Sequence, residues 1–275
     1  MSSCGITNLG SCLAEKLFEF LLYIFNLPVK PLLSMIDNLL TQPVNIEIFA
    51  GVWAIIIYML SLFYGILLLV VGFRFLLAGH SPEQREKAKR SLANIIIMMV
   101  LIQMSFFLYK LILEVISSVT TVIFNLIRDD FFLITMDSIG NIGLELVLIL
   151  PYIATLVITL IFLVLRYLCV GMGVVFFALG IFFYFIEPLN QYGRLILNYL
   201  FVIMALPFFY SIIFLASSKF LELEVFANMK IVVMIGAFSL ANLGTLFLIL
   251  FVIFKAANAV AKPVGGIKTI VGALA

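Results

Sequence analysis

The sequence predicts an all-α, polytopic membrane protein with about six transmembrane helices, within a range of five to seven. Of its 275 residues, 65% are hydrophobic and 11% are charged, and the mean hydropathy is +1.29. Soluble domains carry roughly 45–50% apolar and about 25% charged residues. Because a spanning helix needs about 20 apolar residues and pairs its backbone polar groups internally, we expect the long uncharged runs to cross the cell membrane.

The first 45 residues are predicted to form amphipathic, interfacial helices. Residues 13–27 are apolar but carry charged side chains and are closed by Pro28, which leaves too short a run for a span. Residues 32–40 place apolar side chains at helical spacing, with polar side chains on the other side. We expect both segments to lie at the outer face of the membrane, packed on the spans or on neighbouring subunits.

A transmembrane domain is predicted over residues 46–255. Residues 48–73 contain no charged side chain and form its first span. Ser81 then offers an N-cap, and Pro82 suits the first position of a helix, so a second helix is expected from Pro82 to about Ser117. Its first two turns are polar and exposed, and the rest is apolar enough to cross the membrane.

The distribution of charge predicts the topology. The loop between the first two spans is basic, with Arg85, Lys87, Lys89 and Arg90 against Glu83 and Glu86. Residues 125–145 hold an acidic excess instead. The positive-inside rule therefore places residues 79–91 in the cytoplasm and the N-terminus outside. We interpret the four basic residues as retention signals and anionic-lipid contacts, with docking of a cytoplasmic partner as the alternative.

Two spans are expected between residues 146 and 186. Arg166 is the only charged side chain in this stretch. At about 1.5 Å per residue, one continuous helix would be roughly twice as long as the hydrocarbon core is thick. We expect the turn between Arg166 and Gly173, where Gly171 and Gly173 permit a tight connection.

Spans over residues 192–216 and 231–254 bring the expected total to six. Six crossings put the tail, residues 256–275, outside, although the chain from Lys255 onward carries lysines and no acidic residue. If residues 146–186 formed one crossing and a re-entrant element, five crossings would place the tail in the cytoplasm, as the positive-inside rule requires. Both topologies stay open at this point.

Catalytic chemistry is not expected. The single histidine, His80, lies in a loop, and the three cysteines lack metal-binding spacing. The chain contains none of the common zinc-protease, serine-hydrolase or P-loop motifs. We therefore predict no enzyme activity, no cofactor and no metal site.

Charged side chains inside a membrane are functional candidates because they are energetically costly there. The four candidates are Lys110, Glu114, Arg166 and Glu187. Lys110 and Glu114 stand four residues apart on one helix, and we expect them to neutralise each other at the outer interface, with an ion or proton pathway as the alternative. Arg166 is expected to snorkel to the headgroups from a hairpin turn, and Glu187, before Pro188, to mark a helix end.

Two motifs resemble proteins of conjugation systems. The first is Gly72-Phe73-Arg74-Phe75-Leu76-Leu77-Ala78-Gly79, followed by Ser81-Pro82-Glu83 and Lys87-Ala88-Lys89-Arg90-Ser91-Leu92. The second comprises Leu165-Arg166-Tyr167, Phe185-Ile186-Glu187-Pro188 and Gly193-Arg194. Together they are similar to the TrbL-type polytopic subunit of type IV secretion systems, a group whose archaeal members include the CedA-type DNA-import membrane protein. The chain departs from the bacterial pattern in lacking a Pro in the hairpin after Arg166 and a Trp in the following span.

The resemblance implies a non-enzymatic membrane platform or channel that moves DNA, in conjugation or in DNA import. The partners that it implies are a cytoplasmic secretion ATPase and the pilin-like small membrane subunits of a pilus, beside the membrane lipids. With a formal net charge of +2, DNA is expected to be a transported cargo that is not tightly bound. A homo-oligomer is expected, because one chain has few polar residues with which to line a path.

Two other classes of protein are alternatives. A secondary transporter of a small solute would need a substrate site at broken helices, and Gly171 and Gly173 point to such a break. A lipid-processing enzyme would need convergent histidines or carboxylates, which the sequence does not provide.

Overall fold

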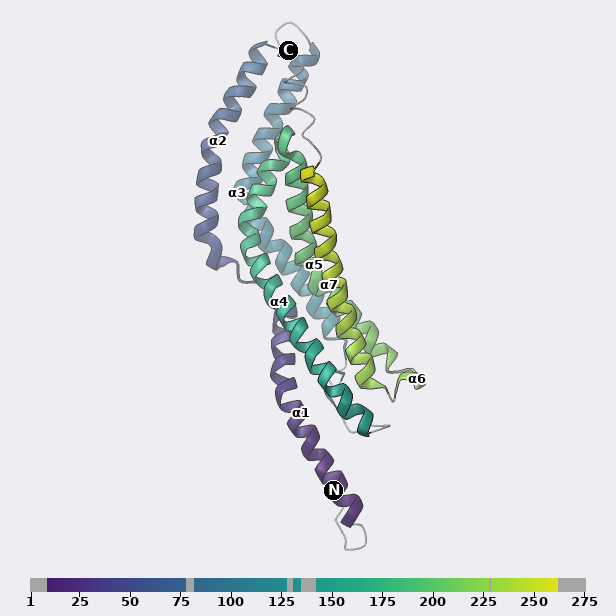
Figure 1. The fold of residues 1–275 in the computed structure, drawn as a ribbon. Coiled ribbons are helices and arrows are strands. Elements are labelled where there is room, and N and C mark those ends of the chain that lie inside the picture. Colours follow the sequence, from purple (N-terminus) through teal and green to yellow (C-terminus); the bar gives the residue numbers. More distant parts are fainter. Residues whose placement is uncertain (1–8, 78–81, 128–130, 135–141, 228, 262–275) are drawn as a thin grey trace. The chain divides into compact units, whose positions relative to one another are not determined.

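The computed structural model describes residues 9–77, 82–127, 131–134, 142–227 and 229–261, and within these ranges the chain is helical and contains no strand (Figure 1). Its elements are α1 (Leu9–Thr41), η2 (Glu47–Phe49), α2 (Ala50–Leu77), α3 (Pro82–Phe124), α4 (Ile142–Phe185), η5 (Glu187–Leu189), α5 (Asn190–Phe220), α6 (Glu224–Ala227) and α7 (Lys230–Ala261). Five helices of the described chain, α2, α3, α4, α5 and α7, are long and apolar enough to cross a membrane. The prediction of a polytopic, all-α membrane protein is confirmed.

The N-terminal region is one helix, which corrects the expectation of two. α1 runs through Pro28 and Pro31 without a break. A proline inside a helix leaves the carbonyl four residues earlier without its donor and costs about 3 kcal/mol or more. Val29, Ile36 and Leu40 are buried in a hydrophobic core, and this packing offsets the cost of the prolines.

The stretch from 146 to 186 is also one helix, so the turn expected between Arg166 and Gly173 is wrong. α4 continues for 44 residues, about 66 Å, without interruption. A Cβ at Gly171 would lie 2.7 Å from Cε2 of Phe49, and one at Gly173 would overlap the Tyr109 hydroxyl. Within α4 these glycines let the side chains of Phe49 and Tyr109 approach the helix closely. Composition alone does not distinguish this role from that of a glycine in a turn.

The five candidate spans agree in number with the five-crossing alternative, but residues 146–185 form one continuous helix in place of a crossing and a re-entrant element. An odd number of crossings from an external N-terminus would place the chain after α7 in the cytoplasm, and the lysines of the tail favour that side. The predicted cytoplasmic loop, residues 79–91, is described only from Pro82 onward. His80 lies outside the described residues, and so does the tail after Ala261.

The chain divides into two compact units, a division that the sequence did not predict. Unit 1 comprises residues 1–43, 117–165 and 206–246, and unit 2 comprises residues 44–116, 166–205 and 247–275. Four helices, α3, α4, α5 and α7, contribute segments to both units. We describe each unit by itself.

Unit 1 has an aromatic core. Tyr152, Tyr210, Phe214 and Phe238 are fully or almost fully buried in it. The ring centroids of Phe214 and Phe238 lie 4.8 Å apart. Offset or tilted aromatic pairs at such distances stabilise a core beyond their buried area.

Unit 2 has two apolar clusters. One gathers Tyr109, Val170, Val174 and Leu200, and the other gathers Ile57, Leu60, Met98, Ile102 and Ala178. Trp53 of α2 donates a hydrogen bond from Nε1 to Oγ of Ser105 in α3, at 2.9 Å. This bond and the second cluster hold α2 against α3.

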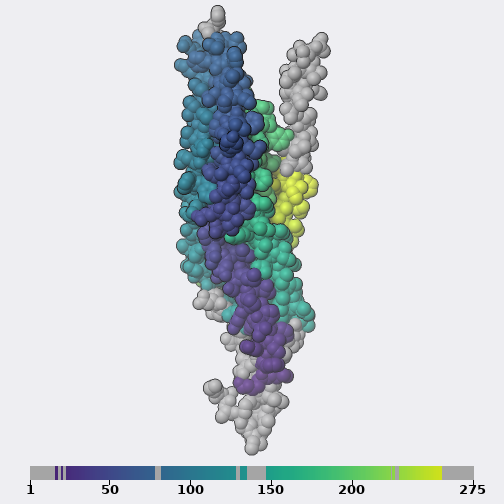
Figure 2. All heavy atoms as spheres, turned by 90° about the vertical axis from the view of Figure 1, so that its left-hand side faces the viewer, coloured from purple at the N-terminus to yellow at the C-terminus, as the bar shows by residue number. Residues whose placement is uncertain are grey.

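The outer side of α2 is apolar and uncovered. Ile55, Leu62 and Leu69 each expose more than half of their surface. In Figure 2, α2 (dark blue) faces the viewer along its length. A helix with such an exposed face suits contact with lipid tails, as expected for the first span.

Candidate functional site

The basic start of α3 is the first candidate site. α3 begins at Pro82, as the N-cap signal predicted. Nζ of Lys87 lies 2.9 Å from Oε1 of Glu83, and Nη2 of Arg90 lies 2.6 Å from Oε1 of Glu86. Both pairs join exposed side chains and have the four-residue spacing that stabilises a helix.

The other two cations of this segment are available to an outside partner. Arg85 and Lys89 are exposed and stand four residues apart on α3. Among the residues that the structure describes, no ion pair engages either side chain. Within the described part of the chain, Arg85 and Lys89 are therefore two cations without an ion pair on one side of the helix.

A pocket of about 290 Å³ lies beside this segment, between the end of α2 and the start of α3. Arg74 and Leu77 line it from α2, and Gln84, Lys87 and Ser91 line it from α3. The sequence analysis named Arg74 only as part of the first motif. In the structure it lines this pocket together with Lys87, one of the four basic residues.

Glu187 lies at the junction between α4 and α5, where a helix end was predicted. It begins the short helix η5, with Pro188 next to it. A pocket of about 150 Å³ is lined by Glu187 together with Arg74, Ser91 and Asn94. Glu187 therefore belongs to the same end of unit 2 as the basic start of α3, and it is exposed.

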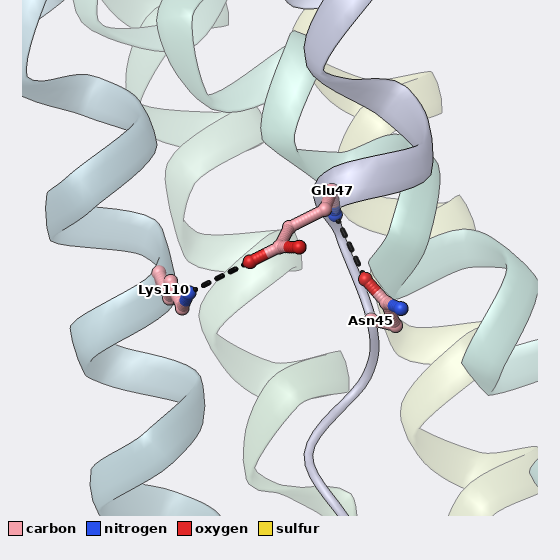
Figure 3. Close-up of polar contacts among 3 residues, drawn as sticks. All are labelled: Asn45, Glu47 and Lys110. Carbon is pink, nitrogen blue, oxygen red and sulfur yellow. Dashed lines mark hydrogen bonds and ion pairs between the residues drawn. The ribbon is translucent and has the colours of Figure 1, made fainter.

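Lys110 and Glu47 form an ion pair near the start of the first span (Figure 3). Nζ of Lys110 lies 3.0 Å from Oε1 of Glu47. The backbone N–H of Glu47 donates to Oδ1 of Asn45 at 3.1 Å, which fixes the turn before α2 (Figure 3). An acidic residue in the first turn also suits the positive end of the helix dipole.

This pair adds a second carboxylate to the interpretation of Lys110, because Glu114 also interacts electrostatically with it, although less than Glu47 does. The sequence analysis matched Lys110 with Glu114, one turn further along α3, and did not consider Glu47, which is 63 residues away. The pair is partly exposed, with 43% of the Lys110 side chain accessible. Surface ion pairs are worth about 0–1 kcal/mol, so the geometry fits a boundary contact of the span better than an ion pathway.

Arg166 is buried inside α4, which corrects the expectation that it snorkels from a turn. Only 7% of its surface is exposed. Nε donates to the carbonyl oxygen of Ile203 at 3.3 Å, and Nη2 donates to that of Met204 at 3.4 Å. Both carbonyls belong to α5.

The proline of α5 explains why these carbonyls accept. Pro207 stands four residues after Ile203 and has no N–H. The carbonyl of Ile203 therefore lacks its normal helical donor. In an apolar interior an unpaired carbonyl is costly, and the guanidinium of Arg166 supplies the missing hydrogen bond.

Unit 1 contains a buried polar network that the sequence analysis missed. Oγ1 of Thr159 donates to Oδ1 of Asn242 at 3.0 Å, and Nδ2 of Asn242 donates to the carbonyl of Thr155 at 3.3 Å. The hydroxyl of Tyr210 lies 2.9 Å from Oγ1 of Thr245. Single polar residues within the apolar runs of α4, α5 and α7 were the available signal.

The network is satisfied and joins three helices. Every buried side-chain polar atom of its described members has a hydrogen-bond partner. Hydrogen bonds of this kind hold helices together within membranes. The arrangement therefore fits helix packing.

The described residues contain no group of three or more His, Cys, Asp or Glu side chains that could hold a metal ion. No family model, no curated protein and no solved structure matches the chain. The resemblance to the TrbL-type subunit therefore rests on the two sequence motifs.

Proposed function

We propose that this multi-pass membrane protein is a non-enzymatic platform or channel subunit of a type IV secretion-like machine that moves DNA across the cell membrane. It would work as a homo-oligomer with a separate cytoplasmic ATPase and pilin-like subunits. The observation that carries the proposal is the basic start of α3, where the helix that begins at Pro82 presents the exposed side chains of Arg85 and Lys89. Arg74 of α2 lines a pocket with Lys87 of the same segment. Arg74 and Lys89 lie within the first motif that resembles conjugation proteins, and Arg85 lies between two parts of that motif.

The charge pattern supports docking of a protein partner over binding of DNA. Two of the four basic side chains are already neutralised by Glu83 and Glu86. Tight non-specific DNA binding draws on several Lys and Arg contacts to phosphates. Arg85 and Lys89 alone suit an acidic patch on a motor protein better than they suit a DNA track.

The packed interiors support an oligomer. The cores of both units are filled by apolar side chains, and the polar network of unit 1 is satisfied internally. A hydrated path for DNA would therefore need several copies of the chain or a partner subunit.

The test compares two variants that each remove two positive charges. We expect the R85Q/K89Q variant to abolish DNA transfer in cells and co-purification with the secretion ATPase. The matched K87Q/R90Q variant should retain both, because its side chains are occupied in helix pairs. Membrane levels of both variants are measured so that loss of the protein is not mistaken for loss of docking.

DNA affinity is measured on the purified protein in nanodiscs at physiological salt. We expect weak binding that is the same for the wild type and for R85Q/K89Q. Nanomolar binding by the wild type that the double substitution removes would show that the helix contacts DNA directly and would overturn the docking proposal.

A secondary transporter of a small solute is the second candidate. The pointer from the sequence, a break at Gly171 and Gly173, is absent because α4 is continuous. The observation that favours a transporter is the buried network around Asn242. If Asn242→Leu abolished function while the protein kept its level and thermal stability, the network would be a solute site and this candidate would replace the first.

A further inference from the structure

Unit 1 contains a pocket of about 510 Å³ that the proposed function does not use. It is bordered by the second half of α1, the end of α3, residues 131–134 and α7. Among its lining residues, Asp37, Ser34 and Asn125 are polar, and Phe124, Phe132 and Phe238 are aromatic. Small-molecule sites have volumes of about 300–1,000 Å³ and combine apolar walls with a few polar groups.

The walls of the pocket are held in place. The hydroxyl of Tyr152 donates to the carbonyl of Phe132 at 2.7 Å, and Nδ2 of Asn26 donates to the carbonyl of Ile134 at 3.1 Å. The ring of Phe132 stacks on Phe124 with centroids 5.8 Å apart and lies 5.9 Å from Phe238. These hydrogen bonds and ring contacts therefore fix the aromatic side of the pocket in place.

Asp37 is the only charged side chain among the described residues that line the pocket. In the part of the chain that the structure describes, no hydrogen bond and no ion pair engages its carboxylate. Partial burial raises the pKa of this carboxyl above its usual value. Within the described residues, Asp37 is therefore an exposed carboxylate with no protein donor, and it lines the same pocket as the aromatic wall.

We propose that this pocket binds an organic cation, with its ammonium group at Asp37 and its apolar body against Phe124, Phe132 and Phe238. A carboxylate attracts the positive charge, and the faces of aromatic rings carry negative partial charge that attracts cations within about 6 Å. The apolar wall adds the favourable burial of the hydrocarbon part. A neutral analogue lacks the first contribution, and an anionic analogue is repelled by Asp37.

Two sources could supply this chemistry, a soluble amine and the ammonium headgroup of a membrane lipid. The probe for the shared chemistry is benzyltrimethylammonium, whose charge does not depend on pH. Its binding is measured by equilibrium dialysis on the full chain in dodecyl maltoside micelles, which contain neither amines nor charges. We expect saturable binding of one probe per chain, with no competition by benzyl alcohol or benzenesulfonate.

Variants test the assignment to this pocket. We expect Asp37→Asn to weaken binding of the probe at least tenfold and Phe132→Leu to weaken it severalfold. Glu222→Gln, which removes an exposed carboxylate of unit 1 that pairs with Lys219, should leave binding unchanged. Circular dichroism and the Tm measured without the probe confirm that each variant is folded.

A further variant covers the acidic residues that follow Ile127 in the chain but lie outside the described residues. If D129N/D130N removed the binding and Asp37→Asn did not, the proposal would be wrong. Equal competition by benzenesulfonate would also overturn it. Competition by added phosphatidylethanolamine, but not by phosphatidylglycerol, would identify the source as a lipid headgroup, and no competition by either lipid would identify a soluble amine.

Discussion

Unit 1 and unit 2 both enclose polar side chains among apolar helices, but they satisfy them differently. In unit 1, neutral side chains around Asn242 bond to one another and to the carbonyls of Thr155 and Ala241. In unit 2, the guanidinium of Arg166 bonds to two carbonyls of α5. The first arrangement depends on several weak partners, whereas the second depends on one charged donor and on a proline that frees an acceptor.

This difference predicts how strongly a single substitution destabilises each unit. Loss of one neutral member leaves the others able to repair part of the network, since hydroxyls and amides can both donate and accept. Loss of the guanidinium leaves the carbonyl of Ile203 without a donor in an apolar interior. We therefore expect unit 2 to be more sensitive to a single substitution.

The largest effect is expected for Arg166→Met. Hydrogen bonds to charged groups contribute about 1.5–3 kcal/mol, so the variant should lose about 2 kcal/mol of unfolding free energy. Pro207→Ala restores the backbone N–H that Ile203 lacks. In that background, Arg166→Met should cost clearly less, as a double-mutant cycle in detergent or bicelles would measure. Additive effects of the two substitutions would refute the role of the proline.

Gly173→Ala in unit 2 is expected to have the next largest effect. Its Cβ would overlap the Tyr109 hydroxyl and lie 2.8 Å from Cδ2 of Leu200. Overpacking of this kind costs about 1–3 kcal/mol. Gly236→Ala in unit 1 is the matched control, because no atom lies within 4 Å of its added Cβ, and it should gain up to about 1 kcal/mol of helix propensity. Equal losses of Tm for the two variants would contradict the packing argument.

A smaller effect is expected for Asn242→Leu in unit 1. Hydrogen bonds between membrane helices contribute roughly 0.6 kcal/mol each, up to about 1.7 kcal/mol. The variant should therefore lose about 1 kcal/mol, less than Arg166→Met under the same conditions. A loss larger than that of Arg166→Met would reverse the comparison between the units.

The smallest effect is expected for Asp37→Asn without any ligand. Because burial raises the pKa of Asp37 above 3.8, its ionised form is less favourable in the folded protein than in the unfolded chain. The contribution of Asp37 to the free energy of unfolding therefore falls as the pH rises from 3.8 through the raised pKa. The Tm of the variant should equal that of the wild type at low pH and slightly exceed it at neutral pH.

The groups that could confound this measurement are few. The other described residues that line the pocket are not titratable. Lys30 lies two turns earlier on α1. Arg128, Asp129 and Asp130 lie outside the described residues, and the D129N/D130N variant controls for the two acids. A Tm difference that did not change with pH would show that Asp37 is not desolvated.

Composition and short-range spacing predicted much of the fold. The long apolar runs gave the membrane helices, and Ser81 and Pro82 placed the start of α3. The pairs of Glu83 with Lys87 and of Glu86 with Arg90 followed from their four-residue spacing. These features are local, so the residues that decide them are neighbours in the chain.

The rest depended on tertiary contacts. Gly171 and Gly173 fit a turn or a close contact equally well, and only Phe49 and Tyr109 decide between these roles. The prediction of two spans between residues 146 and 186 was wrong because it assumed that a helix longer than the hydrocarbon core must break. α4 is longer than that core and is unbroken. The partner of Lys110 and the acceptors of Arg166 come from distant segments, which spacing along the chain does not reveal.

Trp53 gives this protein an intrinsic optical reporter. It is the only tryptophan of the chain, and its indole N–H bonds to Ser105 across α2 and α3. The emission of an indole shifts with the polarity and hydrogen bonding of its surroundings, so the tryptophan fluorescence of the unlabelled protein comes from this one junction. Separation of the first two membrane helices, in an assembly or on contact with a motor, would therefore be visible as a spectral shift without any introduced dye.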